Sequence, residues 1–153
     1  MNDLTQINDL AGALLARLAP APRRQLLGRV ARDVRKSQAD RIGRQLQPDG
    51  TPFAPRKAAA SSGKRRKGKL RERMMFRKLR LAKFLKAGSA PGEAWVGFAG
   101  RAAAIASVHQ RGLTDSPTRG AKKVRYTQRV LLGLTDGEQE RMLDMLLEAV
   151  TPS

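Results

Sequence analysis

The first half of the chain alternates between apolar and polar positions with the period of a helix. Apolar residues recur at spacings of three and four at Leu4, Ile7, Leu10, Leu14 and Leu18. This pattern predicts an amphipathic helix over residues 3–18. The following "APAP" ends that helix, because proline has no amide hydrogen to donate to a helical ladder.

A second helix is predicted over residues 22–46, with Pro22 in its first turn, where proline is tolerated. Its apolar stripe consists of Leu26, Leu27, Val30, Val34, Ile42 and Leu46. Gln38 interrupts that stripe, and arginines cover the remaining faces. The helix should end before Pro48, because proline disfavours helical backbone in the residue before it.

Turn-forming residues dominate residues 47–68. In "PDG", Pro48 presets one dihedral angle, Asp49 can hydrogen-bond its own backbone, and Gly50 accepts a positive φ. We therefore expect a turn at Asp49 and an exposed, flexible basic loop at residues 47–69. Loops of this length are usually functional or disordered.

The segment 70–134 predicts a small sheet and a short helix. Residues 70–87 begin with a part that could be helical, and "LRLAKFLKA" at 79–87 is typical of a strand. "SAPGE" then predicts a turn and "AWVGFAG" at 94–100 a second strand, which together make a β-hairpin. A short helix is expected over 101–111, ended by Gly112, followed by a basic loop over 112–123.

A third strand, "YTQRVLLGL" at 126–134, and a C-terminal helix complete the prediction. Thr135 and Glu138 have the spacing of a capping box before an apolar run that ends at Val150. The sequence thus predicts an α+β fold in one domain, residues 1–153. It would have long N-terminal helices, a small mostly antiparallel sheet, a short middle helix and a C-terminal helix.

Charge changes this picture more than any other bulk property. The chain of 153 residues carries 31 Lys and Arg against 13 Asp and Glu, a net charge of +18. Such a balance favours a polyanionic partner such as nucleic acid, an anionic membrane or an acidic protein surface. The chain has no cysteine, which excludes disulfides and thiol chemistry. Without a basic leader or a long apolar run, it is expected to be intracellular and soluble.

The basic residues concentrate in residues 56–86, which contain fourteen Lys and Arg against the single acid Glu72. Such density attracts phosphates without reading sequence, although a solvated loop is an equally good interpretation. The candidates for facing DNA or a channel are Lys64, Arg65, Arg66, Lys67, Lys69 and Arg71. The acids cluster late, at Asp136, Glu138, Glu140, Asp144 and Glu148. They form either a solvated helix face or a subunit interface.

Patterns that suggest an enzyme are weak. "GKRRKGKL" matches a phosphate-binding loop except at Leu70, which lacks the hydroxyl that binds Mg²⁺. Asp49 could begin a metal-nuclease cluster, but the converging carboxylates that such a site requires are missing. His109 is the only histidine, and a helix-end packing role suits it better than catalysis. We therefore expect no enzyme, no catalytic residue, no metal and no cofactor.

Four stretches in order resemble one family across residues 23–150. They are "QPDGTPFAPRK" after a long helix, "AWVGFAG", "ASVHQRGL" and "RVLLGLTDGEQERMLDMLLEAV". The sequence resembles the phage virion morphogenesis family in these stretches. It departs from the family at residues 126–129, where a proline is expected before Arg129, and in its basic insertion at 56–73. The resemblance gives structural roles to Asp49, Gly50, Trp95, Gly97, Phe98, His109, Gly112, Arg129 and Gly133.

The resemblance implies a structural virion protein of the tail and neck, assembled in the host cytoplasm. It would complete the head-proximal end of a phage tail and help to join tail to head. Its implied partners are copies of itself in a hexameric ring, the tail tube or tail terminator, head-completion or connector proteins, and the packaged DNA end, with no membrane. The alternative from charge alone is a basic nucleic-acid-binding protein without sequence specificity.

Overall fold

The computed structural model describes residues 3–56, 74–90 and 92–152. Within them the chain has the expected α+β class, with helices around two small antiparallel hairpins. The candidate DNA-facing residues at 64–71 and most of the predicted basic loop lie outside the described residues. In residues 47–56 the chain is irregular, apart from an isolated bridge between Leu46 and Pro52.

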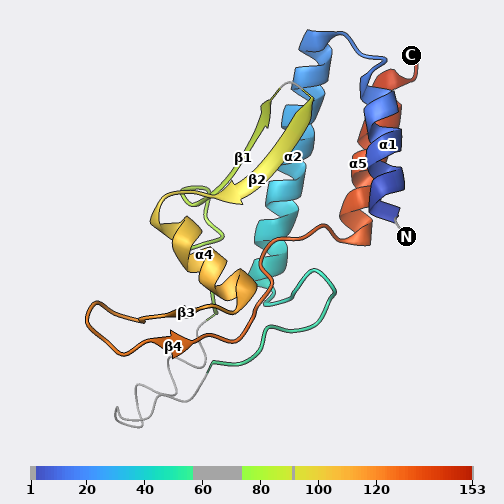
Figure 1. The fold of residues 1–153 in the computed structure, drawn as a ribbon. Coiled ribbons are helices and arrows are strands. Elements are labelled where there is room, and N and C mark those ends of the chain that lie inside the picture. The colour runs from blue at the N-terminus through green and yellow to red at the C-terminus, as the bar shows by residue number, and fades with distance from the viewer. Residues whose placement is uncertain (1–2, 57–73, 91, 153) are drawn as a thin grey trace.

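Three helices form one side of the molecule. They are α1 (Asp3–Leu15), α2 (Pro20–Gly43) and α5 (Asp136–Val150), with α1 and α5 side by side next to the long α2 (Figure 1). The apolar stripes of these helices meet in one core, made of Leu14, Leu26, Val30, Val34 and Leu146. All three predicted helices are therefore present, because their stripes bury against one another.

The helix ends differ from the prediction by a few residues. After Leu15 the chain tightens into turns, with Leu18 N donating to Leu15 O over 3.0 Å. Pro20 and Pro22 both fall in the first turn of α2, where proline loses no helical hydrogen bond. At the other end Gln45 has a φ of 62°, so α2 ends at Gly43 instead of residue 46.

The predicted hairpin is present as β1 (Leu85–Ala90) and β2 (Glu93–Phe98), antiparallel and packed on α2. Arg35 of α2 fixes this packing by donating its Nε to Leu85 O over 2.7 Å. The first strand begins six residues later than the predicted 79–87. Residues 79–84 instead form turns, in which Phe84 N donates to Leu81 O over 2.9 Å.

A second core lies at the far end of α2, beneath α4 (Arg101–Arg111). It consists of Ile42, Phe53, Leu79, Ala102, Ala106 and Leu131. The predicted helix over 101–111 is confirmed, and Gly112 ends it with a φ of 64° in the left-handed region. Glycine adopts this conformation without the steric cost of a side chain.

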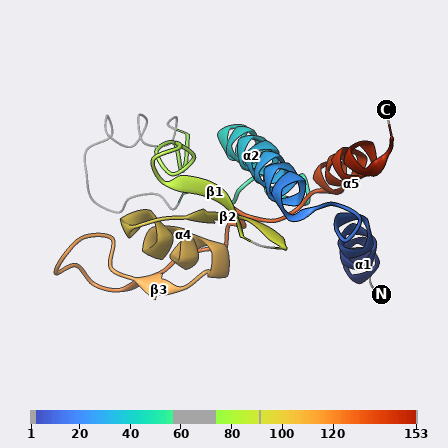
Figure 2. The ribbon, with the colours of Figure 1, turned by 90° about the horizontal axis from the view of Figure 1, so that it is seen from above.

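Residues 112–125 form a hairpin where a loop was expected. It pairs β3 (Thr114–Asp115) with β4 (Val124–Arg125) and projects from the end of the molecule opposite α1 and α5 (Figures 1 and 2). The strand predicted over 126–134 is wrong. That segment is extended, but its backbone is bonded largely to side chains, so no ladder forms there.

Candidate assembly surfaces

The Pro48–Gly50 stretch is a tight turn at the surface. The Asp49 carboxylate accepts from the Thr51 hydroxyl over 2.6 Å and from the Thr51 amide over 2.9 Å. The hydrogen bond from the Thr51 hydroxyl lowers the pKa of Asp49 below its usual value, and the bond from the Thr51 amide lowers it further by a smaller amount. Gly50 has a φ of 86°, which favours glycine. The turn interpretation is confirmed for both residues.

Arg129 ties this joint to the C-terminal half of the chain. Its side chain is buried, and it donates to Ala54 O over 2.7 Å and to Pro55 O over 2.9 Å. Burial lowers the pKa of Arg129, and the neighbouring charge of Arg56 lowers it further. Because the carbonyls of residues 54 and 55 are bound by one guanidinium group, Arg129 fixes the position of these two residues.

Glutamine side chains take the place of strand partners along residues 130–133. The Gln110 side-chain oxygen accepts from Leu131 N over 2.7 Å and from Leu132 N over 3.0 Å, and its amide donates to Leu132 O over 3.0 Å. Gln47 accepts from Val130 N over 3.0 Å. A side-chain amide offers the same donor and acceptor as a backbone peptide. The two glutamines therefore bind the backbone N–H and C=O groups of this segment as a neighbouring strand would.

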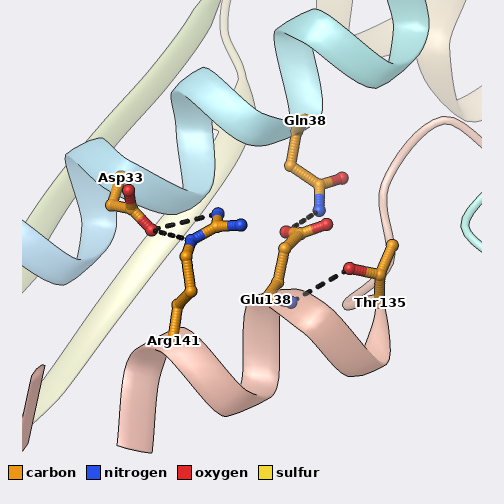
Figure 3. A network of polar contacts seen from close by, with 5 residues as sticks. All are labelled: Asp33, Gln38, Thr135, Glu138 and Arg141. Carbon is orange, nitrogen blue, oxygen red and sulfur yellow. Dashed lines mark hydrogen bonds and ion pairs between the residues drawn. The ribbon is translucent and has the colours of Figure 1, made fainter. Parts of the chain in front are cut away.

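A buried polar network joins α2 to α5 (Figure 3). Gln38 donates to the Glu138 carboxylate over 2.6 Å and to Gly133 O over 2.7 Å, while Arg41 donates to Gln38, to Leu46 O and to Leu131 O. Burial lowers the pKa of Arg41, the Glu138 charge opposes this shift, and Arg44 adds to it. Gln38, the polar residue that interrupts the apolar stripe of α2, is thus the centre of the buried contact between α2 and α5.

The position of Glu138 differs from the expectation that the acids of α5 lie on a solvated face or a subunit interface. Its side chain is only 1% exposed, so it belongs neither to a solvated face nor to an outer interface. Thr135 caps α5 as predicted, accepting from Glu138 N over 3.1 Å (Figure 3). The side chain of Glu138 reaches Gln38 instead of closing the capping box. Nearby, Asp33 and Arg141 form an ion pair at 3.2 Å on the surface.

His109 is packed near the end of α4, as expected. Its ring centroid lies 4.8 Å from that of Phe76 and 5.0 Å from that of Tyr126, both edge-on. Its backbone oxygen accepts from Arg129 N over 2.8 Å. Burial lowers the pKa of His109, and the Arg129 charge lowers it further. The surroundings therefore favour a neutral aromatic ring in a structural role.

Two further glycines, Gly133 and Gly88, lie where another side chain comes too close for a Cβ atom, and at Gly88 that side chain is Trp95. A Cβ on Gly133 would lie 2.8 Å from Pro48 Cγ, so this glycine lets two distant segments touch. Trp95 is 46% exposed and lies over Gly88 of β1, whose added Cβ would come within 2.5 Å of the indole. Phe98 packs against the second core, whereas nothing lies within 4 Å of a Cβ built on Gly97.

Converging acids or metal ligands are missing from the part of the chain that the structure describes. No group of three or more His, Cys, Asp or Glu residues there is placed to hold a metal ion. No described helix is long and apolar enough to cross a membrane. The described surface is rich in exposed charge, including a cluster of acids on α5 and of arginines on α2.

The exposed acids of α5 form a ridge, which we call the acidic ridge: Asp136, Glu140, Asp144 and Glu148. Their spacing of four places them along one face of the helix. Beside the ridge, α1 and α5 border a groove of about 450 Å³, the α1–α5 groove. A basic groove of about 710 Å³ lies near the start of α2 and is lined in part by Arg24, Arg29 and Arg32.

Comparison with known proteins decides the family. The profile of the phage virion morphogenesis family matches residues 2–151. The chain is also 37% identical over 150 residues to "Tail completion protein S" of Escherichia phage P2, covering 97% of each chain. The chain belongs to the phage virion morphogenesis family. No solved structure matches it.

The family residues named from sequence lie mostly in the framework that joins the helices to the second core. The structure brings Arg129, His109 and Gly112 together at the end of α4, and it brings Gly133 against Pro48. Trp95 lies apart on β2, and Asp49 with Gly50 forms the surface turn. These positions of the virion morphogenesis family are therefore spread over several places in the described structure.

Sequence reasoning missed the residues that carry the polar network of this family member. Gln38 was visible as a break in an apolar stripe, which was a usable signal. Arg41 gave no signal, because it looks like an ordinary polar residue on a helix, and Gln110 stood in the quoted stretch "ASVHQRGL" without a role. Their partners lie 90 and 21 residues away, so only the fold reveals them.

Proposed function

We propose that this chain is a structural component of a phage virion that completes the tail. The observation that carries this proposal is its similarity, over 97% of both chains, to a protein named for tail completion. In the finer form of the proposal, the chain acts at the head-proximal end of the tail. It assembles there as a hexameric ring and helps to join the tail to a DNA-filled head.

The described surface supports a role in docking. Exposed charge is segregated between the acidic ridge of α5 and the arginines of α2, as expected for a protein that binds neighbours in fixed orientations. The partners we propose are copies of the chain, the tail tube or tail terminator, and head-completion or connector proteins. The basic tract at 56–86 is proposed to face the packaged DNA end or the channel through which it passes.

A second candidate is a basic protein that binds nucleic acid without reading its sequence. The net charge of +18 favours it. Binding of this kind depends on counterion release, so its affinity falls steeply as salt increases. Specific docking on a tail also uses apolar and shape-matched contacts, so it should persist in salt that strips DNA from the protein.

Binding to isolated tails tests the proposal. Purified, nuclease-treated protein with a gold label is mixed with tails from a phage that lacks it, in high salt, and imaged by electron microscopy. We expect the label at one end of each tail. Label spread along the tails, or retained only by added DNA at low salt, would contradict the proposal and support the nucleic-acid alternative.

A further inference from the structure

The hairpin at residues 113–125, which we call the arm, has features of a docking element. Its ladder consists of two residue pairs only, Thr114 with Arg125 and Asp115 with Val124. Nearly all of its residues are exposed, including Leu113 at 42% and Val124 at 36%. An isolated hairpin of this size is marginal in water, so an arm that keeps apolar side chains exposed is suited to pack against something else.

The arm holds a defined shape through its own polar contacts. The Ser116 hydroxyl donates to Ala121 O over 3.0 Å, and Ala121 N donates to Thr118 O over 3.0 Å. At the base, Tyr126 N donates to Leu113 O over 2.9 Å, which extends the pairing to the body. Preorganisation of this kind reduces the ordering cost of binding.

The two faces of the arm differ. Asp115 lies opposite Val124, so the two side chains share one face, and the alternation of side chains places Leu113 on that face too. Continuing the alternation places Lys122 on this face and Lys123 on the other. The arm carries four cations, Arg119, Lys122, Lys123 and Arg125, against the single acid Asp115. One face therefore carries Leu113 and Val124 together with Asp115 and Lys122, and the arm as a whole is basic.

The α1–α5 groove has the complementary chemistry. Its apolar lining comes from Ile7 and Leu10 of α1 and Leu143 of α5, and Leu10 is 47% exposed. Asp136 and Glu140 of the acidic ridge lie at its border and are exposed. An apolar floor with an acidic border matches a basic arm that exposes two apolar side chains.

The arm and the helices α1 and α5, which line the groove, lie at opposite ends of the molecule in both views (Figures 1 and 2). A chain therefore cannot fill its own groove with its own arm. We propose that the arm of one copy docks in the α1–α5 groove of the next copy, with Leu113 and Val124 on the apolar floor and Lys122 beside Glu140. This inference rests on the proposed function, because such a head-to-tail contact generates a ring when its rotation closes.

Charge restricts where a second copy can bind, and the acidic ridge is the favourable place. In a chain of net charge +18, two copies repel each other over most of their surfaces. The acidic ridge is where a basic element of another copy is attracted. The basic face of α2 is a less suitable donor, because α2 packs against α5 within the same chain, with Asp33 and Arg141 paired between them.

Mixing two variants tests the direction of the contact. The arm variant Lys122→Ser with Val124→Ser and the groove variant Leu10→Lys with Glu140→Lys should each lose self-association in native mass spectrometry. A mixture of the two should give dimers and nothing larger, because it supplies only one intact arm–groove junction. The controls Lys123→Ser and Glu148→Lys make the same charge changes away from the contact and should retain wild-type assembly. Wild-type assembly by the arm and groove variants would overturn the inference.

If copies assemble only on the tail, cysteine cross-linking of tail-bound protein tests the arm–groove contact. The chain has no cysteine, so Lys122→Cys with Glu140→Cys provides a unique pair. On tails, a short bis-maleimide should convert this variant into a ladder of oligomers, whereas each single-cysteine variant should give no more than dimers. Tail-bound protein without a ladder would overturn the inference and leave the proposed function standing. Protein that never binds tails would instead contradict the proposed function.

Discussion

At the scale of single residues, Arg41 holds three parts of the chain with one guanidinium group. It contacts Gln38 on its own helix, Leu46 O beyond the helix end and Leu131 O in the extended segment. Its side chain is only 4% exposed, so a variant without these donors leaves acceptors buried away from water. The position should therefore tolerate substitution poorly.

We expect Arg41→Met to lower the free energy of unfolding by roughly 3–5 kcal/mol, the range for breaking a buried charged contact. Arg44→Met removes the same charge from an exposed side chain on the next turn and should stay within about 0.5 kcal/mol of wild type. Urea unfolding of the two variants measures both values. Equal stabilities would mean that the buried network contributes nothing.

His109 predicts a dependence of stability on pH. Burial lowers its pKa from 6.5, so the folded chain binds this proton less readily than the unfolded chain does. The free energy of unfolding should therefore fall as the pH drops below 6.5, until the pH reaches the lowered pKa. His109 is the only histidine, so His109→Phe should flatten this slope. Urea unfolding of both proteins from roughly pH 7.5 to pH 5, the range in which histidine normally titrates, measures this slope. An unchanged slope in the variant would contradict the assignment.

At the scale of elements, the segment after β4 shows how a chain can be extended without a neighbouring strand. Gln110 binds both Leu131 N and Leu132 N, and Gln47 binds Val130 N. The segment connects β4 to α5 and contributes Leu131 to the second core. Its position therefore depends on side chains that come from α4 and from the Pro48–Gly50 region.

We expect Gln110→Leu to destabilise the fold by roughly 2–6 kcal/mol, because two amides lose their acceptor at about 1–3 kcal/mol each. Gln128→Leu is the matched control, since its exposed side chain makes one bond, to Gln110 O over 3.1 Å. That variant should remain within about 0.5 kcal/mol of wild type. Hydrogen exchange at Leu131 and Leu132 should accelerate in the first variant only. Unchanged exchange there would show that another group holds the segment.

The helices were predictable from sequence because their signals are local. The stripe from Leu26 to Ile42 and the Thr135 cap each lie within one element. The segment 126–134 was predicted as extended from its alternation, but its partners lie as far away as Gln38, 95 residues back. Which group satisfies a backbone amide is a property of the packed fold. For the same reason Glu138 was placed on an outer face, although it is buried against Gln38.

At the scale of the whole molecule, charge and architecture support one account. Helices α1 and α5, which carry the acidic ridge and line the α1–α5 groove, lie at one end, and the arm projects from the other (Figure 1). Sequence alone gave the charges and the family resemblance, whereas the separation of arm and groove required the fold. A molecule with unlike ends is suited to head-to-tail assembly, which can close into a ring.

The central claim is that the chain completes a phage tail, and its most direct test is a phage that cannot make it. Electron microscopy of such a lysate should show DNA-filled heads and separate tails, with few joined particles. Supplying the wild-type chain from a plasmid should restore joined particles. A lysate full of intact, joined and infectious virions in its absence would contradict the account.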